Sequence, residues 1–145
     1  MKIRTDYVTN SSSSSYVIAY RNLPEFDEET LSKYPFLKNY GNLIEKALFT
    51  SSDEYGDTTA GEVFRTKEEW DEFIVAEYGW RGATLKEILE DGDYSDETYN
   101  KAVQYLEAGF NILDKSVDYS DSYCSNMIYT LAKDKENFVI LEDYG

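Results

Sequence analysis

The stretch Ser11-Ser12-Ser13-Ser14-Ser15-Tyr16-Val17-Ile18-Ala19-Tyr20 is the part of the sequence on which the predicted fold depends. Tyr16 to Tyr20 is a short run of aromatic and apolar residues, which is typical of a buried β-strand. Another strand is predicted from Ile3 to Val8. Phe138 to Leu141, near the end of the chain, is a similar β-type run, and we expect it to pair with the N-terminal strands.

Two segments are predicted to be loops. Residues 9–15 contain the serine run, which has little apolar area to bury, so we expect a flexible connection there. A modification or processing site and an anion-binding backbone are alternative interpretations of these serines. Residues 50–61 are rich in Ser, Asp and Gly, and we expect them to form a surface loop.

Helices are predicted from capping signals and from apolar residues at helical spacing. Thr66 with Glu69 and Thr84 with Glu87 have the spacing of capping boxes, and Ser95 begins the longest helical stretch. Its apolar stripe is Tyr99, Val103, Leu106, Phe110 and Leu113, although Gly109 is a position where the helix can end. Further helices are predicted after Asp27 and over residues 36–48, whereas 127–131 fits either a helix or a strand.

These segments together predict one α+β domain over residues 1–145. A small, mainly antiparallel sheet, built from the N-terminal and C-terminal strands, carries about four helices. A chain of 145 residues is long enough to bury a core of its own.

The composition indicates a strongly acidic protein with an aromatic core. Asp and Glu number 29 against 14 Lys and Arg, which gives a net charge of -15, and aromatic residues make up 16% of the chain. Such a negative potential repels nucleic-acid phosphates and attracts basic proteins. We therefore expect no direct binding of nucleic acid; acidity that serves only solubility is the alternative. Neither an apolar leader nor an apolar stretch of about 18 residues occurs, so we expect a cytoplasmic protein.

The sequence offers little for catalysis. Histidine is absent, and Cys124 is the single cysteine. The chain thus lacks the commonest general base, and we interpret Cys124 as a small buried hydrophobe. The best carboxylate cluster consists of Asp91, Asp93, Asp96 and Glu97, but it does not follow the pattern of an EF-hand, and solvated loop and helix-start positions account for it. No cofactor or metal is predicted.

Tyrosines and acids alternate at several places, including Glu77-Tyr78, Asp93-Tyr94 and 118–121. Carboxylates spaced on a firm surface with rings between them could imitate nucleic acid, although such alternation also arises by chance in this composition. Trp80 and Arg81 belong to the residue types that most often anchor interfaces. The structural alternative is that Trp80 packs between two helices and Arg81 caps carbonyls.

Residues 2–18 read Lys-Ile-Arg-Thr-Asp-Tyr-Val-Thr-Asn-Ser-Ser-Ser-Ser-Ser-Tyr-Val-Ile. This stretch resembles an N-terminal signature of many uncharacterised proteins of bacteriophages and prophages, with Tyr7 and Tyr16 where phenylalanine is usual. Gly79-Trp80, 84–89 (Thr-Leu-Lys-Glu-Ile-Leu) and 117–121 (Val-Asp-Tyr-Ser-Asp) are similar to patterns further along some of those proteins. The resemblance implies a phage-type origin, and small acidic phage proteins are often inhibitors of host machinery, anti-CRISPR proteins among them.

We therefore expect a non-enzymatic protein in the cytoplasm of a bacterial host, which blocks a basic, nucleic-acid-binding site on a host protein such as a defence nuclease. A structural or assembly accessory protein of a phage is the first alternative, and a carboxylate-based, metal-dependent enzyme is the second. The oligomeric state is left open. The expected partner contacts are Glu77, Tyr78, Trp80, Arg81, Asp91, Asp93, Tyr94, Asp96, Asp118, Tyr119 and Asp121.

Overall fold

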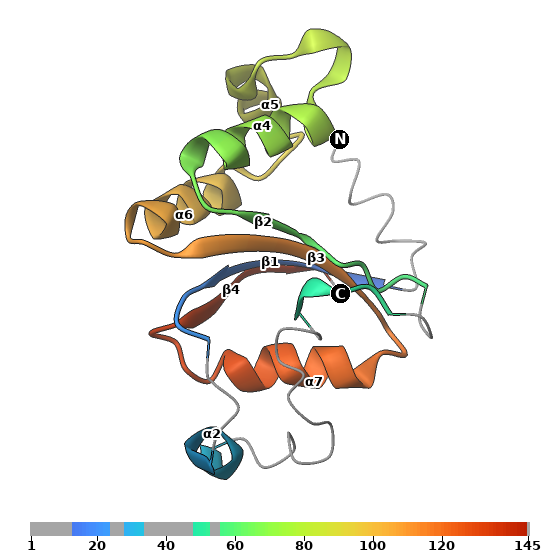
Figure 1. The fold of residues 1–145 in the computed structure, drawn as a ribbon. Helices are drawn as coiled ribbons and strands as arrows, with labels where there is room; N and C mark the ends of the chain where they lie inside the picture. The colour runs from blue at the N-terminus through green and yellow to red at the C-terminus, as the bar shows by residue number, and fades with distance from the viewer. Residues whose placement is uncertain (1–12, 24–27, 34–47, 53–55, 145) are drawn as a thin grey trace.

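The fold is a four-stranded antiparallel sheet with helices on both faces, seen in a computed structural model that describes residues 13–23, 28–33, 48–52 and 56–144 (Figure 1). The strand order is β2-β3-β1-β4, and every neighbouring pair is antiparallel. This confirms the predicted α+β class. The strands are β1 (Ser13–Tyr20), β2 (Glu62–Phe64), β3 (Asn111–Asp118) and β4 (Phe138–Tyr144).

The N-terminal and C-terminal strands β1 and β4 are neighbours in the sheet, as the sequence predicts. Tyr20 lies opposite Phe138 in the register, and Ala19 lies opposite Val139. β1 is flanked by β3 on its other side, so it is a central strand, and its residues from Ser14 onward are buried. A strand covered on both faces reads as a continuous apolar run, which is what 16–20 shows.

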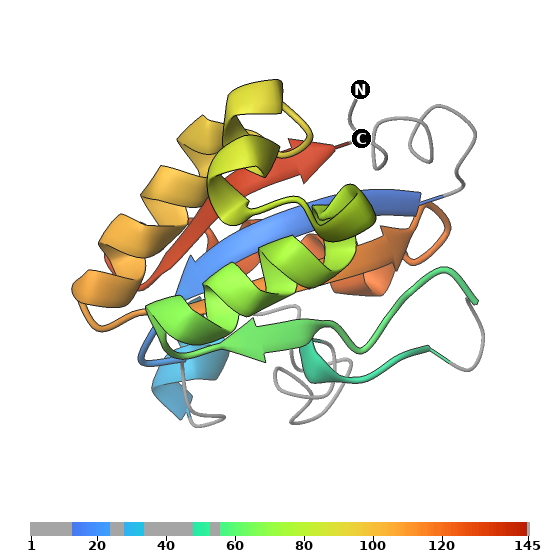
Figure 2. The same cartoon turned by 90° about the horizontal axis from the view of Figure 1, so that it is seen from above.

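Helices cover the two faces of the sheet unequally. The helical layer consists of α4 (Lys67–Tyr78), α5 (Leu85–Asp91) and α6 (Asp96–Glu107), and lies on one face, while α7 (Ser122–Leu131) lies on the other (Figure 1). Seen from above, α4 lies toward β2 and α6 toward β4 (Figure 2). The short helix α2 (Glu28–Lys33) lies beyond α7.

Each face of the sheet has its own core. Val17 and Ala19 pack with Trp70 and the rest of the helical layer, whereas Ile18 packs with Met127 and its neighbours on α7. Alternate residues of one strand point to opposite faces, so β1 contributes to both cores. Trp70 is fully buried and contacts Phe64, Phe73, Tyr94 and Tyr99 through its ring.

Part of the serine run belongs to the sheet rather than to a flexible loop. Ser13, Ser14 and Ser15 are the first residues of β1, and Ser15 lies opposite Ser116 of β3. The loop prediction is therefore wrong for these three residues, because a central strand satisfies the backbone hydrogen bonds of any residue type. Residues 9–12 and the strand predicted at 3–8 lie outside the described residues.

The capping signals of the helical layer are confirmed. Thr66 accepts a hydrogen bond from Glu69 N at 3.1 Å, and Ser95 accepts one from Thr98 N at 3.2 Å. Thr84 and Glu87 form a complete capping box. Glu69 instead accepts from Arg65 N, so the first capping box is only half formed.

The structure corrects or decides the predictions for three further stretches: the end of α6, residues 127–131 and residues 50–61. α6 ends at Glu107, and the chain turns through Gly109 at φ +91°, so Phe110 and Leu113 do not extend the helical stripe and Leu113 belongs to β3. Residues 127–131 are helical within α7. In the predicted surface loop, the described residues 50–52 and 56–61 form no strand or long helix, and only Thr58 is buried. The helix predicted at 36–48 lies outside the described residues except at its end.

Candidate binding surface

The turn that follows α4 presents an aromatic side chain to solvent. α4 ends when Gly79 N donates to Val75 O at 2.9 Å, and a Cβ atom at residue 79 would lie 2.4 Å from that oxygen. Arg81 then adopts the left-handed conformation at φ 53° and ψ 37°. Trp80 remains 59% exposed, the largest exposed fraction among the described large hydrophobic residues. The turn, residues 79–82, thus holds an indole outward at the expense of backbone strain.

Two of the predicted contact residues, Tyr78 and Tyr94, belong to the core instead of the surface. Tyr78 and Tyr94 are buried, and their rings pack edge to face with centroids 4.8 Å apart. The prediction that they touch a partner is wrong, because both side chains point into the core around Trp70. Their alternation with acids in the sequence reflects the inward and outward faces of an amphipathic segment.

The helical layer is held together by a polar link as well as by rings. Tyr99 of α6 donates to Asp71 Oδ1 of α4 at 2.5 Å, and Lys67 Nζ lies 2.6 Å from Asp71 Oδ2. The Asp71 carboxylate raises the pKa of Lys67 through this hydrogen bond, and burial together with the same carboxylate raises the pKa of Tyr99. A carboxylate shared by two helices fixes their relative position.

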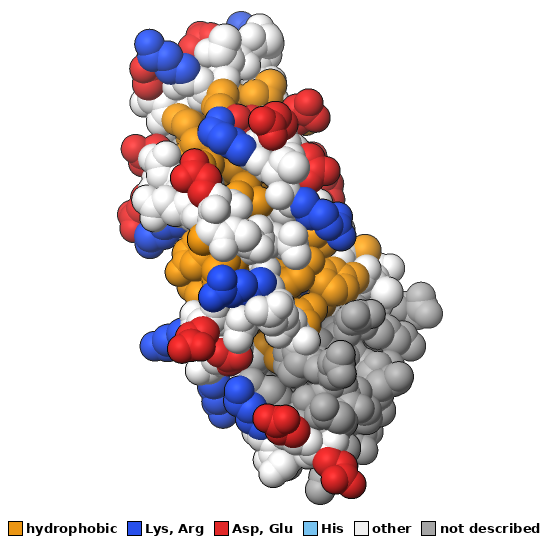
Figure 3. Space-filling model, turned by 60° about the vertical axis from the view of Figure 1, so that its left-hand side comes forward, with side chains coloured by type: hydrophobic (Ala, Val, Ile, Leu, Met, Phe, Trp, Pro, Cys, Tyr) orange, Lys and Arg blue, Asp and Glu red, His pale blue; other side chains and the backbone are white. Residues whose placement is uncertain are grey.

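The helical layer carries much of the excess negative charge. Residues 62–107 contain 13 acidic and 5 basic residues, a net charge of -8 out of -15. On one side of the layer, carboxylates and basic side chains alternate over the helices (Figure 3). Three of the lysines are paired with a carboxylate four residues away on the same helix, namely Lys67 with Asp71, Lys86 with Glu90 and Lys101 with Glu97.

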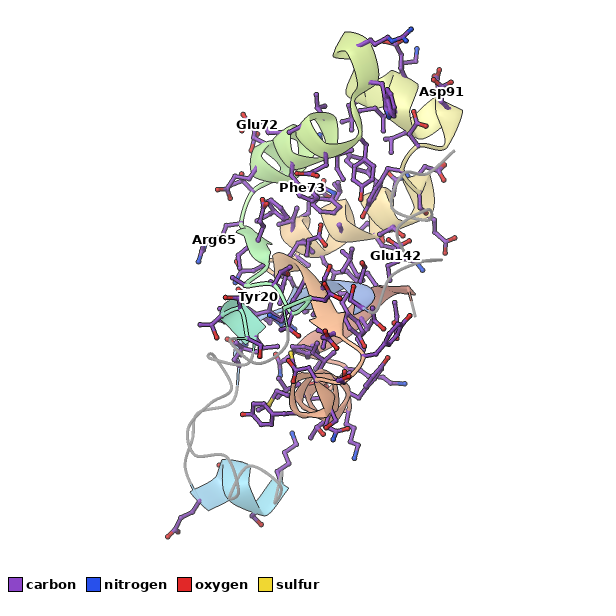
Figure 4. All side chains as sticks on the ribbon, turned by 90° about the vertical axis from the view of Figure 1, so that its right-hand side faces the viewer. Tyr20, Arg65, Glu72, Phe73, Asp91 and Glu142 are labelled. Carbon is purple, nitrogen blue, oxygen red and sulfur yellow. The ribbon has the colours of Figure 1, made fainter. Side chains whose placement is uncertain are left out.

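After this pairing, seven exposed carboxylate side chains of residues 62–107 make no hydrogen bond or ion pair with another described residue: Glu62, Glu68, Glu72, Glu77, Asp91, Asp96 and Glu107. Glu72 points away from the sheet, whereas its neighbour Phe73 points toward it (Figure 4). Asp91 ends α5, and the chain turns there through Gly92. These carboxylates belong to the scaffold that carries Trp80.

A hollow of about 280 Å³ lies between α4 and the β2–β3 edge of the sheet. Three carboxylate residues from three elements line it, Glu62 of β2, Glu77 of α4 and Asp114 of β3, with Phe73 as an apolar wall. Glu62 and Asp114 are also directly opposite in the strand register. A hollow with this lining attracts a cationic group and repels an anionic one. Its remaining lining residues are Thr59, Gly61, Lys115 and Ser116.

The predicted contacts at 118–121 do not join this surface. They form the turn from β3 to α7, which leads to the opposite face of the sheet (Figure 1). Tyr119 is exposed and Asp118 is half-buried, but Asp121 is buried as the N-cap of α7, where it accepts a hydrogen bond from Cys124 N. Asp121 is therefore a structural residue, and its prediction as a partner contact is wrong.

The acidic cluster at 91–97 follows the end of α5 and the start of α6. Asp91 and Asp96 are exposed, and Asp93 is half-buried with its backbone N–H donating to Ile88 O at 3.1 Å. Among the described residues, no group of three His, Cys, Asp or Glu residues has the geometry to hold a metal ion.

The structure also reveals a buried lysine that the sequence did not indicate. Lys115 is 1% exposed, and its Nζ donates to the backbone carbonyls of Thr50, at 3.3 Å, and Thr59. Burial lowers the pKa of Lys115 and raises the pKa of the neighbouring Cys124 to about 11, so this thiol is protonated at neutral pH. A lysine within an eight-residue strand gives no sequence signal of its partners, which come from residues more than 50 positions away.

No protein-family model, no curated protein and no solved structure matches this chain. In the part of the chain that the structure describes, no helix combines the length and the apolar character needed to cross a bilayer.

Proposed function

We propose that this chain is a non-enzymatic binding protein of the phage inhibitor type, whose helical layer occupies a basic, nucleic-acid-binding site on a host protein. The observation that carries the proposal is an exposed Trp80 on the same helical layer as exposed carboxylates that make no ion pair with a described residue. Aromatic anchors contribute much of the affinity of protein interfaces, and carboxylates speed the approach of a basic partner.

The rigidity of the layer supports this proposal. α4 and α6 are joined through Asp71 and Tyr99, and α5 is fixed by its capping box and by Ile88, which is fully buried. Because these helices are held in place before binding, little conformational entropy is lost when a partner docks. The acidic hollow beside Glu77 adds a recess for a cationic side chain of the same partner.

The contacts that we retain for this surface all belong to the helical layer and its turn. Tyr119 and Asp118 are omitted because their turn leads to the opposite face of the sheet. The retained residues are Glu77, Trp80, Arg81, Asp91, Asp93 and Asp96.

A capture experiment from host lysate at two salt concentrations tests the proposal. The immobilised chain should retain a basic protein at about 0.05 M salt and lose much of it at about 0.5 M, because screening shortens the reach of exposed charges. The triple variant Glu77→Gln, Asp91→Asn, Asp96→Asn should bind more weakly. Its control has the same change in charge on other elements: Glu28→Gln, Glu29→Gln, Glu136→Gln, all exposed.

Capture that is equal at both salt concentrations would contradict an acidic-surface mechanism. Equal weakening by the two triple variants would show that only net charge matters, and would contradict the assignment of the surface to the helical layer.

A further inference from the structure

We propose that Trp80 is a stacking platform for an arginine side chain of the partner, which specifies the residue that the acidic surface recognises. This inference rests on the proposed function, because it takes the partner to be basic. It also explains why the turn 79–82 holds an indole in solvent.

The backbone geometry of residues 79–82 holds the Trp80 ring in solvent. Gly79 is held by its close approach to Val75 O, and Arg81 and Gly82 both have positive φ angles, 53° and 79°. A non-glycine residue in this conformation is strained by roughly 1–2 kcal/mol. The result of this geometry is a Trp80 ring that is 59% exposed on a turn that directly follows the buried Tyr78.

The chemistry around the ring selects its occupant. The chain has a net charge of -15, and Glu77, three residues before Trp80 in the sequence, makes no ion pair with a described side chain. Tryptophan is the best aromatic face for a cation, and arginine is the cation found there most often, because its planar guanidinium stacks on the ring. An arginine with its plane on Trp80 can place its N–H groups toward a carboxylate, which a compact lysine ammonium cannot do as well.

The two tryptophans make the inference testable on the full-length chain. Trp70 is fully buried and Trp80 is exposed, so their indole N–H signals in an NMR spectrum report the core and the turn separately. The chain is titrated with a nine-residue arginine peptide and with a nine-residue lysine peptide. We expect the arginine peptide to shift the Trp80 signal while the Trp70 signal stays in place, and to bind about two- to fivefold more tightly than the lysine peptide.

The variants Trp80→Leu and Trp80→Phe distinguish the effect of an aromatic ring at this position from the effect of side-chain size. Trp80→Leu should weaken the arginine peptide more than the lysine peptide and so abolish the preference for arginine, and Trp80→Phe should keep part of the preference. Tyr119→Leu, at an exposed ring on another turn, is the matched control and should leave the preference intact.

An arginine preference that survives in Trp80→Leu, or a Trp80 signal that does not move, overturns the platform while the acidic binding surface stands. If neither peptide binds at low salt, the proposed function and the platform both fail. Trp80→Leu should unfold at the same urea concentration as the parent chain, so that loss of preference is not loss of the fold.

Discussion

Thr58 donates a hydrogen bond from Oγ1 to Asp121 Oδ2 at 2.8 Å, which joins two buried residues 63 positions apart in the sequence. Thr58 Oγ1 also accepts from Asp118 N at 2.9 Å, and Asp121 Oδ1 accepts from Cys124 N at 3.1 Å. One threonine and one aspartate thus fasten the 50–61 segment to the end of β3 and to the first turn of α7.

Replacing Asp121 with alanine should destabilise the fold by about 2–3 kcal/mol. The variant loses the N-cap of α7, worth about 1 kcal/mol, and leaves a buried threonine hydroxyl without its acceptor. Urea unfolding measures the change, with Glu136→Ala, at an exposed turn position, as a near-neutral control. A loss below about 0.5 kcal/mol would show that the network is dispensable.

Cys124→Ala should change how stability depends on pH. The thiol has a pKa near 11 in the folded chain against an ordinary value of 9.0, because burial disfavours the thiolate. The protonated thiol therefore favours the folded state below pH 9, and this contribution of about 2–3 kcal/mol is lost as pH rises toward 11. The free energy of unfolding of the parent chain should fall relative to that of Cys124→Ala over this range; a constant difference would contradict the burial of the thiol.

Gly79→Ala should be more harmful than Gly82→Ala. A Cβ atom at 79 meets Val75 O at 2.4 Å, so the end of α4 must shift, whereas at 82 nothing lies within 4 Å and only the positive φ is unfavourable, at about 1–2 kcal/mol. Thermal unfolding ranks the two variants. The indole signal of Trp80 should move in Gly79→Ala, and an unmoved signal would show that the close contact does not set the turn.

Glu62→Gln should stabilise the fold by a few tenths of a kcal/mol, up to about 1 kcal/mol. Glu62 lies directly opposite Asp114 in the strand pair, and both line the acidic hollow. Removing one of two facing carboxylates relieves their repulsion. The gain should shrink when unfolding is repeated at high salt, since Glu62 is exposed; a gain independent of salt would point to a cause other than charge.

The elements that sequence analysis predicted well are those with local causes. The N-caps at Thr66, Thr84 and Ser95 each depend on a side chain and a backbone N–H three residues away, so the sequence contains the whole interaction. The C-terminal strand was predicted for a related reason. Its apolar residues have to be buried, and pairing with another strand of the sheet buries them. Neither β2 nor β3 was predicted, because a short stretch such as 62–64 becomes a strand only when a neighbour supplies the pairing, and 111–113 were assigned to a helical stripe.

The predicted contact residues also divide into those whose exposure has a local cause and those whose burial depends on tertiary packing. Trp80 is exposed because of a local turn, and the glycines of that turn can be seen in the sequence. The buried face of a segment, in contrast, depends on the elements against which the segment packs. Tyr78 and Tyr94 follow acids in the sequence as the exposed Tyr119 does, yet both are inside the protein.

The sequence by itself determined the α+β class, the pairing of the first described strand with the last, the helix starts and the excess of negative charge. These features follow from composition and from interactions between residues a few positions apart. Tertiary structure alone decided that three of the serines form part of a central strand, that Lys115 is enclosed by carbonyls of a distant segment, and that Glu62, Glu77 and Asp114 meet at one hollow. The physical reason is that burial and long-range pairing are properties of the packed chain, in which the neighbours of a residue are set by the register of the sheet and not by its place in the sequence.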